Sequence, residues 1–574
     1  MKKASIIVAH GKSDFFSLRM KIGSSFCFFV VFAMVALLIN PNAYSQSVDT
    51  SILNWDTTEV VQGVNWYSFL GEDSRFESLQ SYNALDVDLE STHVDVRFLW
   101  FLDRTALLSM VANQVGATAV INATYLSQNT QFYKSQDSLY QRITEVNNHP
   151  GYWMAEGAVF STEENRFDID FTTISELDLM FSSDIMSGGP VLIDNGDPVG
   201  LTKLERPHRT HEYTRHPRTA IAVAEDGKRL ILFTVDGRAE QSEGLTTPEL
   251  TELFYEDFNA SEALNLDGGG TTTMWIQGET STGVVNYPTN NRNFDHHGER
   301  WTGLAIALIP REKPDYNKTE NRYSCEAEFQ VHEGEEKYLY LGDQIDGLMD
   351  MPANQSFTLS SWVKPDFQSG SGNDLTIFNK RIRNNKERSD DKGYEVFLTH
   401  EGHVKALLDN GVQEFELISK NAIPNNQWAH VSLTLDSSTA SLFVNGQREA
   451  AVEDEALREG FDNKFFLTAG ARREWTEEEF QGKTYPHSPW SKPKFSFVTD
   501  PFSGALDELQ VWHKALSSSE IQQLSDEKAG NKIPVNANSL ISYWPLDEEK
   551  RNFAQDYTGN VHGTYMGEIN RRCN

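Results

Sequence analysis

Apolar and polar residues follow different patterns in the two halves of the chain. In the first half, runs with helical spacing are mixed with short apolar runs that are typical of strands. Residues 104–126 begin with helical spacing, turn at Gly116 and end in the apolar run ATAVI. Residues 218–238 contain two apolar runs around a Glu-Asp-Gly-Lys turn, which predicts a β-hairpin. The mixture indicates an α+β domain.

A capped helix is predicted over residues 246–258. Thr246 or Thr247 can cap it, and Glu249 stands close enough to complete a capping box. The helix leads into the stretch ALNLDGGGTTTM, an apolar run that ends on an aspartate and three glycines.

The second half changes to short alternating runs broken by Gly, Asn and Asp, as in residues 357–365, 428–436 and 440–446. This pattern is typical of an all-β sandwich. Between the halves, residues 311–321 are charged, contain a proline and have no apolar periodicity, which favours a linker. We therefore predict a multidomain chain, with an α+β domain over 46–310 and an all-β jelly-roll sandwich over 322–574.

The N-terminus has the pattern of a signal peptide. An apolar run from Phe26 to Ile39 follows Arg19 and Lys21 and precedes the small-x-small sequence Ala43-Tyr44-Ser45. Cleavage is expected near Ser45, so that residues 1–45 are a signal peptide and no transmembrane anchor remains. The protein is then secreted, periplasmic or at the cell surface; an uncleaved anchor is the alternative.

Charge and length limit the function. The 574 residues carry a formal charge of −33, which argues against nucleic acid or an anionic membrane as the main partner. An anionic substrate would need a local cluster of arginines. The length is typical of two to four domains, and the oligomeric state is not predicted.

Cysteine positions suggest a disulfide in the second domain. Of three cysteines, Cys27 leaves with the signal peptide, which leaves Cys325 and Cys573 at the two ends of one segment. Export to an oxidising compartment favours a disulfide between them, and two free thiols are the alternative.

Several co-linear motifs support a resemblance for the first domain: residues 187–199, 215–223, 232–238, 244–254 and 263–274. In this order and spacing they resemble the phosphodiester glycosidase family over about residues 60–310. Two positions depart from the family pattern, where Ala123 replaces a glycine and Thr271 replaces a serine. The resemblance implies a hydrolase that cleaves sugar-1-phosphodiester bonds of the N-acetylglucosamine-1-phosphodiester type.

The resemblance also implies the candidate site. Asp236 and Asp267 each follow an apolar run and are the candidate catalytic carboxylates, as nucleophile, base or orienting group. Arg218 and Arg238 could grip phosphate oxygens with their planar guanidinium groups, although surface ion pairs are the alternative.

Small and amide residues complete the candidate substrate contacts. The backbone of Gly268, Gly269 and Gly270 could approach a substrate closely because no side chain intervenes. Asn122 and Asn265 could contact substrate or cap turns. Gly188 and Gly189 could line the site or only form a turn before a strand.

Metal and cofactor chemistry has little support in the sequence. His208, His211, His216 and the pair His296-His297 have no spacing typical of a zinc site. A hard divalent cation held by carboxylates is left open, so the metal is unknown. The chemistry that the resemblance implies requires no cofactor.

The second domain resembles the laminin G-like, concanavalin A-like jelly-roll family. The resemblance rests on residues 357–365, 425–447 and 502–524, the last of which includes a predicted Ser-capped helix at SSSEI. The terminal segment, residues 540–567, is expected to pair as an edge strand beside the start of the domain and to bring Cys573 towards Cys325. The implied role is glycan or surface attachment, although this fold also serves protein binding and structural support.

Two functions compete at this point. The first is a secreted hydrolase of sugar-1-phosphodiester bonds in a glycan or glycopolymer, held near its polymer by a lectin-like module. The second is a non-catalytic extracellular glycan- or matrix-binding protein. Asp-Gly-Arg at 236–238 and Asp-Gly-Gly-Gly at 267–270 favour the enzyme.

Overall fold

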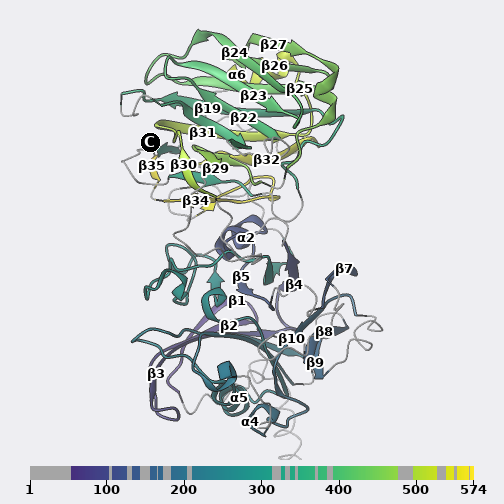
Figure 1. Ribbon diagram of the computed structural model, residues 1–574, viewed down its shortest axis with the longest axis vertical. Coiled ribbons are helices and arrows are strands. Elements are labelled where there is room, and N and C mark those ends of the chain that lie inside the picture. The colour runs from purple at the N-terminus through teal and green to yellow at the C-terminus, as the bar shows by residue number, and fades with distance from the viewer. Residues whose placement is uncertain are drawn as a thin grey trace, which may run out of the picture. The chain divides into compact units, whose positions relative to one another are not determined.

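The structure is a computed structural model of the full chain (Figure 1). It describes residues 53–101, 106–125, 132–141, 156–163, 166–171, 182–202, 210–225, 227–312, 325–329, 337–342, 347–368, 373–383, 392–463, 465–475, 495–526, 538–548, 553–567 and 569–573. The predicted signal peptide, most of the predicted linker and the side chains of His208 and His211 lie outside the described residues.

A seven-stranded antiparallel sheet positions the candidate site in the first domain. Its strands, in spatial order, are β1 (Asp56–Val61), β2 (Val64–Asp73), β3 (Ser78–Asp88), β13 (Arg229–Val235), β12 (Arg218–Ala224), β14 (Glu262–Asn265) and β11 (Val191–Ile193). The predicted hairpin over residues 218–238 is confirmed, since β12 and β13 pair from Arg218 opposite Val235 to Ala224 opposite Arg229. Both strands are almost wholly buried, as their continuous apolar runs require.

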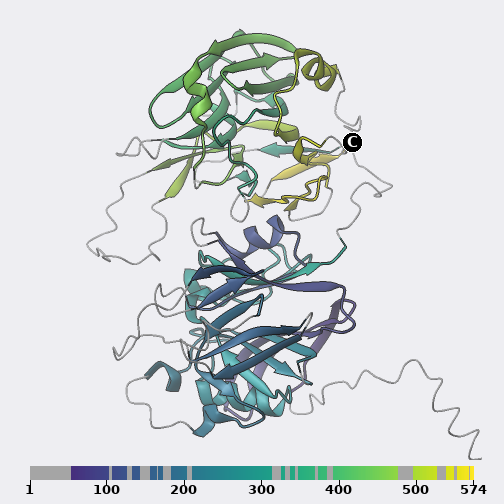
Figure 2. The ribbon, with the colours of Figure 1, turned by 90° about the vertical axis from the view of Figure 1, so that its right-hand side faces the viewer.

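Two smaller sheets complete the first domain. The five-stranded sheet consists of β7 (Ser138–Gln141), β6 (Tyr133–Ser135), β10 (Ile185–Gly188), β8 (Gly157–Glu163) and β9 (Arg166–Phe171). The four-stranded sheet consists of β15 (Met274–Ile276), β5 (Ala119–Asn122), β16 (Leu304–Pro310) and β4 (Val94–Trp100). One apolar core contains side chains from all three sheets. The strands are drawn in purple to teal in Figure 2.

Helices are few and short in the described part of this domain. The segment 104–126 contains α2 (Leu108–Gln114), a turn with Gly116 at φ 62°, and then β5, as its pattern predicts. The predicted capped helix is α5 (Thr247–Glu256), where Thr246 is the N-cap and forms a capping box with Glu249. The other helices are α4 (Val199–Thr202) and the 3-10 turns η2 (Thr210–Tyr213), η3 (Gly269–Thr271) and η4 (Thr289–Asn291). The architecture is strand-rich, and the α+β description of this domain is not confirmed.

The second domain is a jelly-roll-like sandwich, and the residues of its two large sheets pack around one apolar core. The first sheet has the order β27 (Gln447–Glu453), β26 (Thr439–Val444), β25 (Ala429–Asp436), β19 (Phe357–Pro365), β31 (Gly504–Trp512), β17 (Cys325–Phe329) and β35 (Asn570–Cys573), with β32 (Leu540–Trp544) also paired to β31. The second has the order β24 (Glu414–Ala422), β23 (His403–Asp409), β22 (Gly393–Leu398), β20 (Leu375–Lys380), β28 (Thr468–Ala469), β18 (Tyr338–Tyr340), β34 (Gly563–Met566) and β33 (Phe553–Ala554). A small sheet contains β21 (Ile382–Arg383), β29 (Arg472–Trp475) and β30 (Phe495–Thr499).

The strand predictions for this domain are confirmed at residues 357–365, 429–436 and 439–444. The Ser-capped helix is α6 (Ser518–Asp526), whose first turn is held by reciprocal hydrogen bonds between Ser517 and Glu520. The strand that pairs with β17 at the start of the domain is β35, just beyond the segment 540–567 in which the terminal edge strand was predicted. Within that segment, β32 pairs with β31 and β34 pairs with β18.

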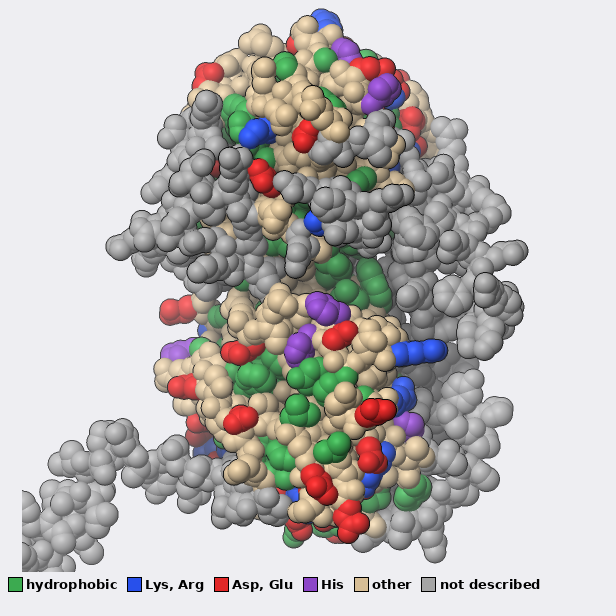
Figure 3. Space-filling model, turned by 90° about the vertical axis from the view of Figure 1, so that its left-hand side faces the viewer, with side chains coloured by type: hydrophobic (Ala, Val, Ile, Leu, Met, Phe, Trp, Pro, Cys, Tyr) green, Lys and Arg blue, Asp and Glu red, His purple; other side chains and the backbone are tan. Residues whose placement is uncertain are grey.

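Surface charge and helix length bear on the predicted location. Asp and Glu side chains are more frequent than Lys and Arg on the described surface drawn in Figure 3, in keeping with the negative net charge. Within the described residues, no helix is long and apolar enough to cross a membrane.

Candidate active site

Strand β14 carries Asp267 to the edge of the seven-stranded sheet. The strand is buried and pairs with β12 on one side and β11 on the other, so its direction is fixed by two ladders. The chain then passes Asp267 and turns through η3. A rigid strand end is a precise place from which to present a carboxylate.

The triglycine turn is crowded, which explains why side chains are absent from it. A Cβ atom at Gly268 would lie 2.5 Å from the carbonyl oxygen of Pro217. Gly269 has a φ of 68°, in the left-handed region that favours glycine, and its N–H donates to the same carbonyl at 2.9 Å. The turn is therefore packed tightly onto the residue before β12.

The Asp267 carboxylate is only part-buried, although its backbone is fixed. Its Oδ2 atom accepts a hydrogen bond from Thr271 Oγ1 at 2.9 Å, and its backbone carbonyl accepts one from Asn122 Nδ2 at 2.7 Å. Burial raises the pKa of Asp267 to about 6, against the opposing effects of the Thr271 hydrogen bond and the Arg300 charge. A pKa near the working pH suits a group that exchanges protons.

Two exposed arginines flank the triglycine turn. A Cβ atom at Gly269 would lie 3.2 Å from Arg238 Nη2, and one at Gly270 would lie 3.0 Å from Arg300 Cζ. The glycines thus leave space that the guanidinium groups occupy. Burial and the nearby charge of Arg300 both lower the pKa of Arg238. The turn therefore carries a local positive charge on an acidic protein.

Arg300 lies beside the triglycine turn, and the sequence analysis did not predict it. It follows the pair His296-His297 by a few residues and belongs to none of the motifs that carried the resemblance. The separation of about thirty residues between Arg300 and Gly270 is closed by the tertiary fold alone. The sequence indicated it only indirectly, through the expectation that an anionic substrate would need a local cluster of arginines.

His216 lies beside Arg238, with its Nδ1 atom 3.5 Å from Arg238 Nη2. Burial and the charges of Arg218 and Arg238 lower the pKa of His216 to about 4. The ring is therefore neutral near neutral pH, and it adds no positive charge to the arginine pair.

Asp236 has a different environment from Asp267. It is 1% exposed; Oδ1 accepts hydrogen bonds from Asn286 Nδ2 (2.8 Å) and the Tyr287 N–H (2.9 Å), and Oδ2 accepts one from Ser81 Oγ (2.7 Å). Burial raises its pKa to about 6, although the three hydrogen bonds oppose the shift. The carboxylate holds the segment that carries Tyr287, whose ring stacks on Phe294 with centroids 3.9 Å apart.

Arg218 also points into the protein. Its side chain is buried, with Nε donating to the Leu245 carbonyl at 2.9 Å and Nη2 to the Thr214 carbonyl at 3.0 Å. Burial lowers its pKa. The guanidinium joins two chain segments beside the site and does not reach the surface next to Arg238.

The two candidate asparagines are buried connectors. Asn122 Oδ1 accepts hydrogen bonds from Thr219 Oγ1 at 2.7 Å and the Thr273 N–H at 3.1 Å. Asn265 Nδ2 lies 2.8 Å from Tyr125 Oη and 3.0 Å from the Gly189 carbonyl oxygen, while its Oδ1 has no hydrogen-bond partner within the described part of the chain. Both residues fix the strands around Asp267.

Gly188 and Gly189 form the bend between β10 and β11. A Cβ atom at Gly188 would lie 2.9 Å from the Asn265 carbonyl oxygen, and the Gly189–Pro190 peptide bond is cis. The Gly189 N–H donates to the same Asn265 carbonyl at 2.9 Å. These glycines pack against the strand that carries Asp267.

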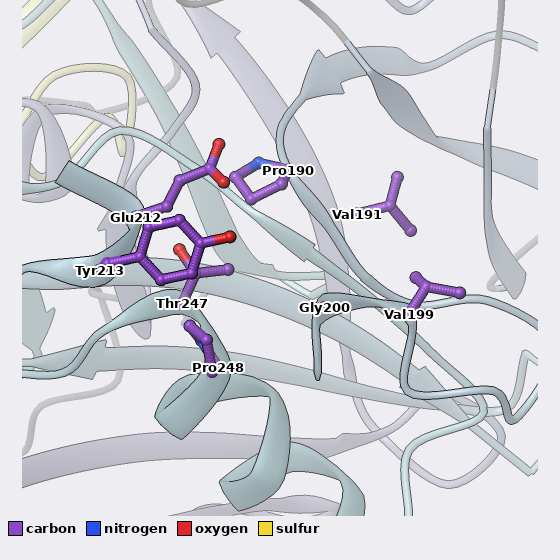
Figure 4. Close-up of a pocket in the computed structure, with 8 residues that line it drawn as sticks. All are labelled: Pro190, Val191, Val199, Gly200, Glu212, Tyr213, Thr247 and Pro248. Atoms are coloured by element: carbon purple, nitrogen blue, oxygen red, sulfur yellow. The ribbon is translucent and has the colours of Figure 1, made fainter. Parts of the chain in front are cut away.

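A pocket lies on the flank of this site (Figure 4). It contains about 270 Å³ of space, part of it open to solvent. The residues that line it are Pro190, Val191, Val199, Gly200, Glu212, Tyr213, Thr247 and Pro248. None of them was a candidate site residue in the sequence.

The structure thus brings together Asp267, the triglycine turn and Arg238, and it adds Arg300. It buries Asp236, Arg218, Asn122 and Asn265 around them. Within the described residues, no group of three or more His, Cys, Asp or Glu side chains could hold a metal ion. The roles of all these residues stay predictions.

Comparisons with known families agree with the motif order. Residues 115–309 match the family model described as phosphodiester glycosidase, and residues 333–484 match the one described as concanavalin A-like lectin/glucanases superfamily. Both resemblances, and their order along the chain, are confirmed. The first match indicates a glycosidase-type hydrolase.

One curated relative is the SPbeta prophage-derived uncharacterized protein YomE of Bacillus subtilis (strain 168), which is 31% identical over 147 residues. The match covers 21% of this chain and 22% of the relative, so the chain spans about a fifth of the length of the relative that it matches.

Two solved structures are similar at low identity. The zebrafish N-acetylglucosamine-1-phosphodiester alpha-N-acetylglucosaminidase catalytic domain, auto-inhibited by its pro-peptide, is 18% identical with a TM-score of 0.34, over 45% of this chain and 88% of that one. A SAP-like pentraxin from Limulus polyphemus is 15% identical with a TM-score of 0.27, over 44% of this chain and 94% of that one.

Proposed function

We propose that this protein hydrolyses sugar-1-phosphodiester bonds in a glycan or glycopolymer, at the triglycine turn of its first domain. The observation that carries the proposal is the part-exposed Asp267 carboxylate beside a turn that two guanidinium groups flank. The match of residues 115–309 to the phosphodiester glycosidase family supports the same chemistry.

Arg238 and Arg300 bind the phosphodiester. Guanidinium groups offer paired N–H donors that suit phosphate oxygens, and both groups are exposed. Their positive charge holds an anionic group in a protein whose net charge would repel it. The same contacts stabilise the negative charge that develops on the leaving phosphate.

Asp267 activates the water. The carboxylate takes a proton from a water molecule whose oxygen attacks the anomeric carbon, and the bond from that carbon to the phosphate oxygen breaks. The phosphate leaves as a monoester anion with the bonding electrons, so no acid has to protonate it. One accessible carboxylate is therefore enough, in contrast to the paired carboxylates of ordinary glycosidases.

The buried groups act through position. Asn122 holds the Asp267 backbone, and Asp236 holds the Asn286-Tyr287 segment through its hydrogen bonds. Arg218 joins the segments that carry Thr214 and Leu245. We assign these residues to positioning and leave contact with the reacting atoms to Asp267 and the two exposed arginines.

Export and attachment belong to the same proposal. Residues 1–45 act as a cleaved signal peptide, and the second domain attaches the enzyme to a glycan surface. The match of residues 333–484 to a lectin superfamily supports the attachment role.

A disulfide between Cys325 and Cys573 would close the second domain. Strands β17 and β35 pair with these two residues directly opposite each other. Opposed residues of antiparallel strands have Cα atoms about 4.5–5.5 Å apart, which is within the range of disulfides. Mass spectrometry of an unreduced digest should find the two peptides linked; complete alkylation without reductant would refute the bond.

The central experiment is turnover by the purified protein on a panel of sugar phosphodiesters that includes an N-acetylglucosamine-1-phosphodiester. In ¹⁸O-labelled water, the label should enter the released sugar, since the anomeric C–O bond breaks. Label in the phosphate would indicate an ordinary phosphodiesterase. A folded protein with no turnover on the whole panel would favour the non-catalytic glycan-binding alternative.

A further inference from the structure

Arg300 lies between two residues that hold the chain in place. Its guanidinium is exposed, and its Nε atom donates to Asn290 Oδ1 at 3.2 Å. Long, flexible side chains lose much conformational freedom when they bind a ligand, so an arginine that binds an anion at a defined position benefits from a fixed backbone. The contacts of its neighbours, Glu299 and Trp301, therefore bear on how well Arg300 binds phosphate.

Glu299 ties this segment to the start of α2. Its Oε1 atom accepts a hydrogen bond from the Ser109 N–H at 3.0 Å, and its Oε2 atom accepts one from Ser109 Oγ at 2.6 Å. The N-cap residue of α2 is apolar and offers no side-chain acceptor, so Glu299 supplies one from a distant loop. Two backbone hydrogen bonds between Ala106 and Thr302, at 3.0 and 2.9 Å, hold the next part of the segment. The backbone of Arg300 is thus anchored on both sides.

Trp301 joins the same segment to the second domain. Its ring stacks on that of Phe466, with centroids 6.3 Å apart and planes inclined at 21°. Phe466 is buried, and its ring centroid lies 4.4 Å from that of Tyr340 on β18. These three rings lie in or against an apolar cluster that also contains Met110 and Val111 of α2. Both domains therefore contribute side chains to the cluster that supports Trp301.

Polar and close-packed contacts join α2 to the second domain as well. All seven residues of this helix are buried. Asn113 Nδ2 donates to Thr564 Oγ1 on β34 at 2.8 Å, and a Cβ atom at Gly342 would lie 3.3 Å from the Gln114 side chain. Densely packed interiors have low compressibility and transmit strain. A change on the second-domain side of this contact can therefore reach the segment that carries Arg300.

We propose that the second domain positions Arg300 for phosphate binding, through the stack of Phe466 on Trp301. Both aromatic residues are positioning residues, because they act on Arg300 and not on the substrate. The inference rests on the proposed function for its effect on turnover, but phosphate binding can be measured without a reacting substrate. The second domain is then a structural part of the anion site, in addition to its proposed role in attachment.

Titration of the purified protein with inorganic phosphate, followed by ³¹P NMR, tests this positioning. Phe466→Ala and Trp301→Ala should each raise the Kd for phosphate at least about threefold, because the aromatic stack is lost. Trp301→Phe keeps a stacking ring and should retain the affinity within about twofold. The matched control is Phe415→Ala, since Phe415 is equally buried but packs in the core of the second domain. An equal loss of phosphate affinity in this control would overturn the proposal, because general destabilisation would then explain the effect.

A double-mutant cycle shows whether the effect passes through Arg300. In the Arg300→Ala background, Phe466→Ala should change the Kd for phosphate by less than about twofold, because the residue on which it acts is gone. A full further loss in that background, or an unchanged affinity in Arg300→Ala alone, would overturn the proposal.

Binding and turnover together distinguish this inference from the proposed function. Phosphate binding that Arg300→Ala and Phe466→Ala both weaken, in a protein with no turnover on any phosphodiester, would retain the positioning role and refute the proposed hydrolase. Turnover with a KM and a phosphate affinity that Phe466→Ala leaves unchanged would retain the hydrolase and refute the positioning role.

Discussion

Asp236 and Asp267 both end an apolar strand-like run and begin an Asp-Gly pair, but the protein surrounds them differently. Asp236 is almost fully buried, and three hydrogen bonds from neighbouring groups satisfy its carboxylate. Asp267 is part-exposed, and a threonine hydroxyl and a glycine N–H lower its pKa. Burial raises the pKa of both to about 6. A raised pKa therefore does not distinguish a reacting carboxylate from a positioning one, whereas access does.

The largest expected effect is the difference in activity between asparagine variants of these two carboxylates. Asp267→Asn should lower kcat at least about a thousandfold, since the isosteric amide cannot take a proton from water. Asp236→Asn keeps an oxygen for Asn286 and Tyr287 and should retain activity within about tenfold. Steady-state turnover of the N-acetylglucosamine-1-phosphodiester measures both, and circular dichroism checks that they fold. Equal losses of kcat in the two variants would contradict the distinction between a reacting Asp267 and a positioning Asp236.

The free energy of unfolding should depend more strongly on Asp236 than on Asp267, the opposite of the order expected for activity. Asp236→Ala leaves the Asn286 amide and the Tyr287 N–H without their buried acceptor, so the free energy of unfolding should fall by about 3 kcal/mol. Asp267→Ala removes a part-exposed group and should cost about 1 kcal/mol or less. Urea unfolding of the first domain measures both values. A larger loss at Asp267 would contradict the assignment of Asp236 to positioning.

The next largest effect is expected when either exposed arginine is removed, and it concerns substrate binding. Arg238→Ala or Arg300→Ala should raise KM about tenfold to a hundredfold, which corresponds to the loss of a charged hydrogen bond worth about 1.5–3 kcal/mol. The control is Arg311→Ala, because Arg311 is exposed at the end of β16 and pairs with Asp95. The affinity for inorganic phosphate should fall with the first two changes. An unchanged phosphate affinity in both would place the anion elsewhere.

The smallest expected effect concerns the pH profile. Because burial raises the pKa of Asp267 to about 6, kcat/KM should rise as the pH increases through about 6 and the base loses its proton. The Thr271 hydrogen bond lowers this pKa, so Thr271→Val should move the midpoint upward by about half a pH unit, while Thr271→Ser should leave it in place. A midpoint that shifts downward in the valine variant would be inconsistent with this role of the threonine.

Local patterns predicted much of the fold because they report local physics. The capping box of Thr246 and Glu249 and the hairpin of β12 and β13 depend on residues that are close in the sequence. Cys325 lies opposite Cys573, as expected, but the strand that does this is β35, which lies beyond the predicted segment 540–567. The α+β description of the first domain is not confirmed, since the described part contains mainly strands with few short helices.

The site was only partly predictable for a physical reason. The motifs located Asp267, the triglycine turn and Arg238, and spacing alone offered no means to distinguish an exposed guanidinium from a buried one. Arg218 and Arg238 appeared equivalent at the two ends of the hairpin, but the buried Arg218 donates to two backbone carbonyls. Arg300 reaches the turn from a distant loop, and no local pattern encodes that approach.

The order of the two domains, the family resemblance of each and the strand that presents Asp267 could be predicted from the sequence. Motif order, periodicity and capping depend on residues that are close together along the chain. The tertiary structure decided which Asp-Gly carboxylate is accessible, which arginines flank the turn, and that a pocket with Glu212 and Tyr213 lies beside them. Burial and long-range contacts depend on how distant segments pack. They determine whether a charged side chain is accessible to a substrate or only stabilises the surrounding structure.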